Sequence, residues 1–216
     1  MTSGAPPAGI VRIENGAFAE NCYLVYDPSG PDLVIVDPGE ETGRFFAEAG
    51  RLHRTIAAIW LTHAHIDHIQ GVAAVREATG APIHLHPADR PLYDALPQQG
   101  LWLGQRLEAP PPPDARLAHG QRLRVGGREF EVRHAPGHTP GHVVFSGDGV
   151  VLGGDVLFEG SIGRTDLPGG NHQALLASIR RELLSLPDET VVHPGHGPPT
   201  TIGRERAGNP FLTGPG

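Results

Sequence analysis

The chain has 216 residues and a formal net charge of −7 with neutral histidines. This charge disfavours a nucleic-acid partner, because phosphate backbones bind broad basic surfaces. The single cysteine, Cys22, can form no internal disulfide, which fits a reducing compartment. No apolar stretch approaches the roughly 18 residues of a membrane helix, and the first residues lack the pattern of a secretory signal. We therefore expect a cytoplasmic protein that does not bind a membrane.

Short runs of Val and Ile between turn residues predict strands in the first half of the chain. We expect these strands at Ile10–Ile13, Cys22–Tyr26, Leu33–Val36, Thr55–Leu61 and Pro82–His86. Apolar spacing predicts helices at Glu40–Leu52, Gly71–Thr79 and from about Pro87 to Leu96. The segment Pro97–Asp114 contains four consecutive prolines, which predicts a surface loop or flap. Its position and composition suggest a part of the substrate wall.

The second half of the chain repeats the strand-rich pattern and then ends in a helix and a strand. We expect strands at Leu123–Val125, Arg128–His134, His142–Ser146, Val150–Leu152 and Thr190–His193. Apolar spacing predicts a helix at Asn171–Leu186, and the last ten residues are expected to be frayed. This order indicates an α/β protein with two sheets and helices outside them. No linker divides the chain, so residues 1–216 are expected to form a single domain.

The segment Thr62–Gly71 concentrates side chains that can bind metal. His63, His65, Asp67 and His68 lie within six positions directly after a predicted strand. Residues two apart in extended backbone face the same side, so His63 and His65 can converge on one metal. A turn after them lets Asp67 and His68 point to a second position nearby. A surface histidine cluster is the alternative, and four ligands in one string after a strand disfavour it.

Three later segments each offer one more ligand at a turn near a predicted strand. They contain His138 in Gly137–Gly141, Asp155 after two glycines, and His196 in Pro194–Pro198. Each of them alone fits an ordinary turn residue equally well. Together with the first string they supply five histidines and two aspartates and no thiolate, a donor set that suits zinc or iron.

These motifs resemble those of the metallo-β-lactamase superfamily, and in particular its short glyoxalase II-like (hydroxyacylglutathione hydrolase-like) hydrolases. The resemblance rests, in order, on Thr62–Gly71, Gly137–Gly141, Gly153–Asp155 and Pro194–Gly197, with support from Asn21–Val25, Val36–Gly39 and Gly163–Asp166. It covers nearly the whole chain. It implies a four-layer αββα sandwich of two mixed β-sheets flanked by helices, with the metals at one edge.

The resemblance also implies how seven residues divide between two divalent metal ions. It assigns one metal to His63, His65 and His138, the other to Asp67, His68 and His196, and the bridge between them to Asp155. Zinc is the expected metal, and iron and manganese accept the same ligands. A hydroxide held by the metals would be the nucleophile, because metal binding lowers the pKa of water from 15.7 toward about 7. Asp67 would also orient that hydroxide as a catalytic residue.

The implied reaction is hydrolysis of a small-molecule thioester, such as S-lactoylglutathione, to a carboxylate and a free thiol. Larger glyoxalase II enzymes have an additional C-terminal helical region whose basic residues help to hold glutathione. This chain ends about 20 residues after His196 and has no lysine, which puts the thiol carrier in doubt. The oligomeric state has no signal in the sequence.

Other activities occur on the same fold. A persulfide dioxygenase with a single iron, held by two histidines and one aspartate, shares a segment like Gly163–Asp166. A lactonase uses the same bridged centre. A β-lactamase is disfavoured, because those enzymes generally lack the aspartate found here at Asp155. The negative charge disfavours an RNA-processing nuclease, and the complete set of seven residues disfavours a non-catalytic binding protein.

A few further residues are expected near the centre without binding metal. The resemblance suggests that Asp37 and Thr62 fix imidazole tautomers, and that Asp166 pairs with Arg164 near the bridging aspartate. Turn formation is an equally good explanation for them. Cys22 is expected to be a small buried hydrophobic residue. Surface or core roles are expected for the remaining histidines, of which His142 and His193 lie close to ligands in the sequence.

Overall fold

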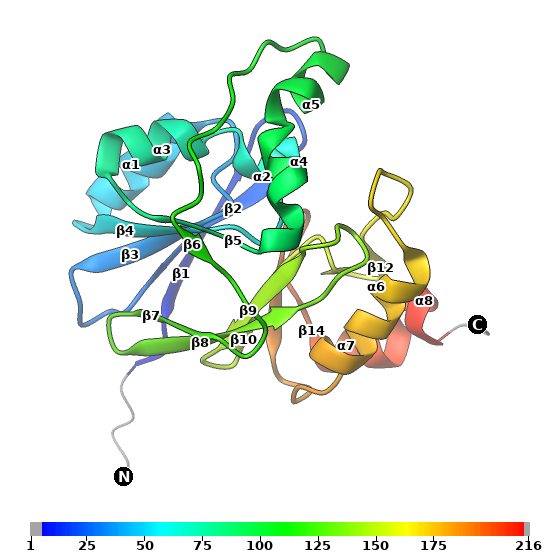
Figure 1. Cartoon of the computed structure of the whole chain (residues 1–216). Coiled ribbons are helices and arrows are strands. Elements are labelled where there is room, and N and C mark those ends of the chain that lie inside the picture. The colour runs from blue at the N-terminus through cyan, green and yellow to red at the C-terminus, as the bar shows by residue number, and fades with distance from the viewer. Residues whose placement is uncertain (1–5, 214–216) are drawn as a thin grey trace.

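The computed structural model describes residues 6–213, and two six-stranded sheets packed face to face form its centre (Figure 1). The first sheet has the strand order β1 (Gly9–Asn15), β2 (Glu20–Tyr26), β3 (Asp32–Val36), β4 (Thr55–Trp60), β5 (Ile83–Leu85) and β6 (Ala115–Arg116). Neighbours from β1 to β3 are antiparallel, and neighbours from β3 to β6 are parallel. Because β4 and β5 are parallel, they end at the same edge of the sheet.

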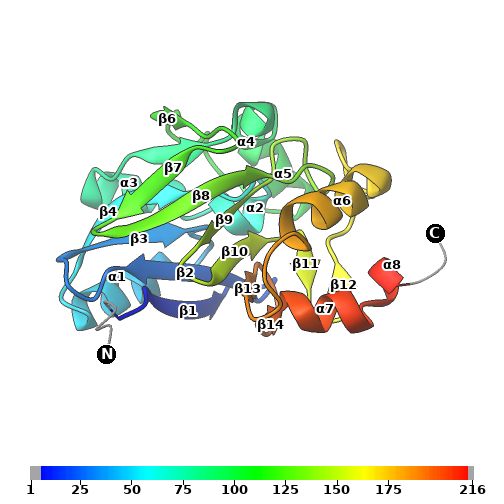
Figure 2. The ribbon, with the colours of Figure 1, turned by 90° about the horizontal axis from the view of Figure 1, so that it is seen from below.

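The second sheet is seen from below in Figure 2. Its strand order is β14 (Thr200–Thr201), β13 (Val191–Pro194), β10 (Val150–Gly154), β9 (Val143–Gly147), β8 (Arg128–His134) and β7 (Arg122–Val125). Its neighbours are antiparallel except β10 and β13, which run parallel and so end at one edge. A separate hairpin follows β10 and consists of β11 (Leu157–Phe158) and β12 (Ser161–Ile162).

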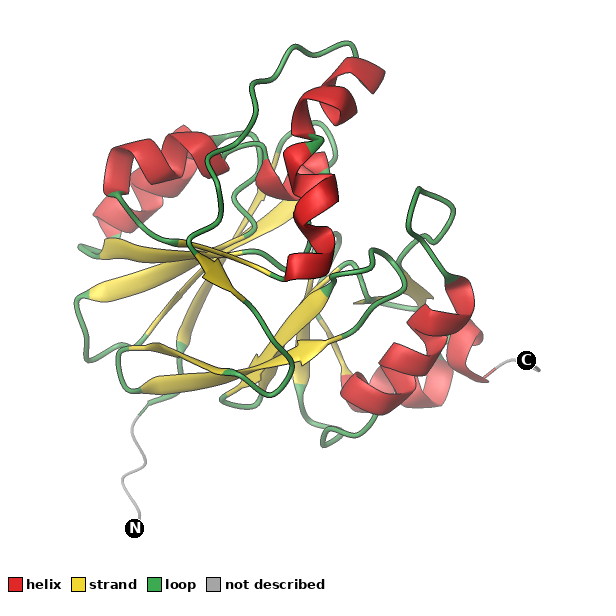
Figure 3. Ribbon diagram, in the orientation of Figure 1, coloured by secondary structure: helices red, strands yellow, loops and turns green. Residues whose placement is uncertain are grey.

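Helices cover the outer face of each sheet (Figure 3). The first sheet packs against α1 (Thr42–Arg51) and α3 (Val72–Thr79), and the second against α6 (His172–Ser178), the helical turn η2 (Ile179–Leu183) and α7 (Ile202–Gly208). The other helical segments are α2 (Ile66–Ile69), η1 (Pro87–Asp89), α4 (Arg90–Asp94), α5 (Leu96–Trp102) and α8 (Pro210–Thr213). The layers confirm the predicted αββα sandwich. Across residues 6–213, no helix is both long and apolar enough to cross a membrane.

Strand β2 shows why the sequence forms a sheet that is buried on both faces. Successive side chains of a strand point to opposite faces. Cys22 and Leu24 pack with the helices outside the first sheet, whereas Tyr23 and Val25 pack against the second sheet. All four are buried, so the strand has a continuous apolar sequence instead of an alternating one. The predicted burial of Cys22 is confirmed.

Aromatic side chains fill the space between the two sheets. Trp60, at the end of β4, lies with its ring centroid 5.2 Å from that of Phe145 and 5.9 Å from that of Phe130. The two phenylalanines come from β9 and β8 of the second sheet, and all three side chains are buried. This contact fixes how the end of β4 sits over the second sheet, directly before the string that begins at Thr62.

Two sequence predictions need correction. The segment Pro97–Asp114 was expected to be a loop, but its first residues belong to α5 and only the stretch after Trp102 is irregular. Pro97 lies in the first turn of α5, where its missing N–H breaks no helical hydrogen bond. The last ten residues were expected to be frayed, but residues 207–213 include the end of α7 and all of α8. The remaining residues of that prediction, 214–216, lie outside the described part.

One polar side chain connects the helices α7 and α8 to the rest of the described structure. Asn209, between α7 and α8, donates from Nδ2 to the Ser161 carbonyl at 3.0 Å and to Glu205 at 2.8 Å. The Asn209 side chain is buried, and these contacts join the terminal helices to the β11–β12 hairpin. A polar residue near a chain end gives no sequence signal for such a contact, so the pattern predicted fraying.

We expect Phe145→Ala to lower the free energy of unfolding by about 3–5 kcal/mol, because it leaves a cavity between the sheets. Urea denaturation followed by circular dichroism measures the change. Phe211→Ala is the matched control, since Phe211 is 46% exposed, and it should stay within about 0.5 kcal/mol of the parent protein. Equal losses in the two variants would show that the aromatic contact does not hold the sheets together.

Candidate metal centre

Four segments from both sheets meet at one edge of the sandwich. The string Thr62–His68 follows β4, and the turn that carries His138 joins β8 to β9. Asp155 and His196 follow β10 and β13, whose parallel pairing brings both residues to the same edge. The two sheets are connected at this point, because the Val143 N–H donates to the Thr62 carbonyl at 2.8 Å.

The backbone of the first string has the conformation that the sequence predicted. His65 is extended, with φ −72° and ψ 150°, and α2 begins at the next residue. His63 and His65 therefore point to the same position, while α2 carries Asp67 and His68 to a second one. The change from extended chain to helix separates the two pairs of ligands.

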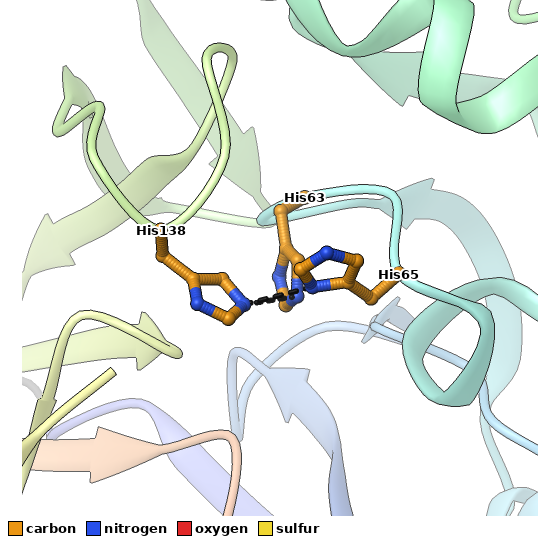
Figure 4. A group of neighbouring side chains, drawn as sticks. All are labelled: His63, His65 and His138. Atoms are coloured by element: carbon orange, nitrogen blue, oxygen red, sulfur yellow. Dashed lines mark hydrogen bonds between the residues drawn. The ribbon is translucent and has the colours of Figure 1, made fainter. Parts of the chain in front are cut away.

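The first group of donors consists of His63, His65 and His138, which face one another across the site (Figure 4). His65 Nδ1 lies 2.8 Å from His138 Nε2, which lies 3.2 Å from His63 Nε2. Burial lowers the pKa of His63, and it lowers the pKa of His65 to about 3. Both imidazoles are therefore neutral near pH 7, and neutral imidazole is the form that binds metal.

The second group consists of Asp67, His68 and His196. Asp67 Oδ2 lies 3.2 Å from His196 Nε2 and 3.7 Å from His68 Nε2. Burial acts to lower the pKa of His68, but the charges of Asp67 and Asp155 outweigh it and hold the pKa above its usual value. The negative charges of Asp67 and Asp155, which raise the pKa of His68, also attract a metal cation.

Asp155 lies between the two groups. Its Oδ2 is 3.5 Å from Nε2 of both His138 and His196, and its Oδ1 is 3.5 Å from His68 Nε2. Burial acts to raise the pKa of Asp155, but the nearby His68 outweighs it, so the pKa is low and the carboxylate is ionised. All seven residues predicted from the sequence are thus brought together, and one carboxylate contacts both groups.

The unpartnered atoms of this cluster fit divalent cations. His68 Nε2 and Asp155 Oδ1 are buried and have no hydrogen-bond partner. Polar atoms buried in this way are costly, and native proteins usually supply a partner or an ion. Imidazole and carboxylate donors without thiolate suit zinc, iron or manganese. Glycine is required beside them, because a Cβ on Gly195 would lie 2.1 Å from Asp155 Oδ1.

Asp37 and Thr62 orient the histidines, as the resemblance suggested. Asp37 Oδ2 accepts from Thr62 Oγ1 at 2.5 Å and lies 3.1 Å from His68 Nδ1. Thr62 Oγ1 lies 3.0 Å from His63 Nδ1. Asp37 also forms a possible third donor group with the two histidines. Because its oxygens already accept these hydrogen bonds, we assign it to orientation of the rings and not to a metal.

Surface or core roles were expected for His142 and His193, and the Arg164–Asp166 pair was expected near Asp155. His142 contacts the centre, because its Nε2 accepts from the Asp155 N–H at 3.0 Å. His193 does not, and its ring lies 5.4 Å from that of Tyr23. The Arg164–Asp166 ion pair lies on the surface with side chains 60% and 68% exposed. Only the Arg164 carbonyl reaches the site, where it accepts from His138 Nδ1 at 2.8 Å.

Asp89 and Gln99 support the centre and were missed by sequence reasoning. Asp89 Oδ2 accepts from the Ala64 N–H at 3.1 Å and from Thr139 Oγ1 at 2.8 Å, so it joins two ligand segments. Gln99, on α5, accepts from the Ile66 N–H at 2.9 Å and donates to the Ala64 carbonyl at 3.0 Å. Asp89 lies in the predicted helix from about Pro87 to Leu96 and Gln99 in the predicted loop Pro97–Asp114, and neither position carries a metal signal.

Two residues of β2 hold the loop that carries His196. Asn21 donates from Nδ2 to the Pro194 carbonyl at 3.0 Å, and the Tyr23 hydroxyl donates to the same carbonyl at 2.7 Å. Both side chains are buried. The first sheet therefore fixes a ligand that follows a strand of the second sheet, which explains why the segment Asn21–Val25 accompanies the metal motifs.

Comparison with known proteins identifies the family. The model of the metallo-beta-lactamase superfamily matches residues 15–196. The chain is also 38% identical to the hydroxyacylglutathione hydrolase GloC of Haemophilus influenzae, over 91% of this chain and 94% of that protein. This protein belongs to the metallo-β-lactamase superfamily, whose fold its two sheets and outer helices reproduce.

Solved structures agree with this assignment. The BLEG-1 B3 metallo-beta-lactamase is 42% identical with a TM-score of 0.89, and the match covers 95% of this chain and 100% of the other. TTHA1623, described in a di-iron-bound form, is 46% identical with a TM-score of 0.85, over 94% of this chain and 100% of the other. The family and the donor set together define a metal-dependent hydrolase.

We expect Asp89→Ala to weaken metal binding by about 10–100-fold, the usual cost of removing a residue that positions metal ligands. Competition of the metal-loaded protein with a chelator gives the affinity. Asp94→Ala is the control, because Asp94 pairs with Arg90 on the neighbouring exposed helix and touches no ligand segment. If the metal affinity of Asp89→Ala equals that of the control, Asp89 does not position the ligands.

Proposed function

We propose that this protein is a thioester hydrolase of the glyoxalase II type, which cleaves S-acyl thiol conjugates at a centre of two divalent metal ions. The observation that carries the proposal is the placement of Asp155, whose carboxylate faces both donor groups. A centre of two metal ions would use both groups and the carboxylate between them. The relative in Haemophilus influenzae, a hydroxyacylglutathione hydrolase, supports the reaction class.

The centre lies at the floor of a cavity of about 520 Å³. Divalent metal ions bound there would supply a nucleophilic water near pH 7 and would polarise the scissile carbonyl. Asp67, Asp155 and His196 line the cavity. The Asp67 carboxylate would accept a proton from the attacking water. Attack breaks the carbon–sulfur bond, so one thioester and one water give a carboxylic acid and a thiol.

We expect Asp155→Ala to lose metal and to lose at least about 100-fold in hydrolysis of S-lactoylglutathione, because both donor groups lose their shared carboxylate. Metal content by mass spectrometry and release of free thiol measure the two effects. Asp32→Ala is the control, since Asp32 is exposed at the start of β3. Full activity in Asp155→Ala, or faster hydrolysis of a β-lactam than of any thioester by the parent protein, would refute the proposal.

A persulfide dioxygenase is the second candidate, favoured by one contact. The segment Gly163–Asp166 that suggested it reaches the centre through the Arg164 carbonyl beside His138. Such an enzyme uses a single iron. The two candidates therefore differ in metal content and in the second substrate they consume.

We expect about two metal ions per chain and no oxygen uptake with glutathione persulfide. Metal analysis of the purified protein and an oxygen electrode measure these quantities. The chelated protein, reloaded with zinc or with iron, serves as the matched control for metal identity. One iron per chain together with oxygen uptake would replace the hydrolase assignment with the dioxygenase.

A further inference from the structure

The wall of the cavity above the metal centre is apolar. Its volume of about 520 Å³ falls within the roughly 300–1,000 Å³ of small-molecule sites. The apolar side chains on its wall include Phe18, Leu92, Trp102, Leu103, Phe158 and Leu167. They come from the β1–β2 turn, from α4, α5 and the residue after it, from β11, and from the loop after β12. Five separate segments of the chain therefore supply one continuous apolar surface beside the scissile position.

Several of these side chains are exposed although they are large and apolar. Trp102 is 65% exposed, Phe18 is 49% exposed and Leu103 is 45% exposed. A group of exposed large apolar side chains usually marks a binding surface. This group of exposed side chains borders the cavity of the metal centre. We therefore expect the ligand that enters the cavity to cover these side chains.

The charges of the cavity disfavour a substrate with carboxylates. Among the described residues that line it, Arg164 is the one arginine, and the chain has no lysine. The Arg164 guanidinium already donates two hydrogen bonds of 2.8 Å to Asp166. Glutathione has carboxylates at both ends, and this wall offers them no unpaired cation.

We infer that the preferred substrate is a thioester whose larger organic group is apolar and uncharged and lies against this wall, in place of a glutathione conjugate. This inference rests on the proposed thioester hydrolysis. The apolar group is either the acyl chain or the thiol, since both adjoin the scissile bond. Trp102 and Leu103 form the part of the wall contributed by α5 and by the residue after it. We assign the preference for an apolar group to these two side chains.

The first experiment compares kcat/KM for four thioesters with the zinc-loaded protein. S-hexanoyl-N-acetylcysteamine has a long acyl chain, S-hexyl thioacetate has a long thiol, S-acetyl-N-acetylcysteamine has neither, and S-lactoylglutathione has the charged carrier. Each buried methylene favours binding by about four-fold. We expect at least one hexyl or hexanoyl substrate to exceed both small and charged substrates by about 10-fold or more. S-lactoylglutathione as the best substrate would overturn the inference and leave the hydrolase assignment intact.

Variants then test which wall residues carry the preference. Trp102→Ala should lower the ratio of hexanoyl to acetyl kcat/KM by about 10-fold, because it removes the largest apolar side chain of the wall. Leu101→Ala is the matched control, since Leu101 is the preceding residue of α5, is 59% exposed and does not line the cavity. Its ratio should equal that of the parent protein. An unchanged ratio in Trp102→Ala would exclude the wall as the source of specificity.

A binding measurement separates this inference from the proposed reaction. The chain has two tryptophans, of which Trp60 is buried and Trp102 is exposed. Subtracting the fluorescence of the Trp102→Phe variant leaves the signal of Trp102, whose change with ligand measures binding. Hexanamide should bind at least about 10-fold more tightly than acetamide. If hexanamide binds more tightly while no thioester is hydrolysed, the preference for an apolar ligand is confirmed and the proposed thioester hydrolysis is wrong. Equal binding of the two amides would overturn the inference whatever the reaction.

Discussion

The structure depends on holding seven metal-capable side chains against one another in a buried place. Burying so many polar side chains together is costly without a cation among them, although nitrogens such as those of His65 and His138, 2.8 Å apart, can share a hydrogen bond. The fold must therefore impose this arrangement through the backbone. It does so by bringing four strand ends and turns to one edge and by joining their loops with Asp89, Gln99 and Asp37.

The same edge also gives the site two different halves. The floor is formed by the donor groups, whereas the wall above it comes from α5, from turns and from the β11–β12 hairpin. In the proposed reaction the donors of the floor would perform the hydrolysis and the apolar wall would select the substrate. The two parts are connected, because Gln99 on α5 accepts from the Ile66 N–H at 2.9 Å within the ligand string.

Much of the centre could be predicted from local sequence. Four of its ligands form one string after a strand, and the other three stand beside glycines in turns. The string His63–His68 carries its own geometry: His65 is extended, and Asp67 and His68 lie at the start of a helix. The seven residues and the order of most strands were predicted in this way. The α5 helix was not, because a proline at the start of a helix resembles a loop signal. The terminal helices were also missed, since Asn209 acts only through distant partners.

The sequence by itself indicated two sheets with outer helices through its periodicity, and its short motifs indicated the family, whose resemblance implied the αββα layers and the set of donors. Only the tertiary structure decided how the donors meet, with Asp155 facing both groups and Asp89 joining the loops of Ala64 and Thr139. Only the tertiary structure brought the residues of the apolar wall together as well. Contacts between residues far apart in the chain leave no periodic pattern, because each partner alone resembles an ordinary turn or surface residue.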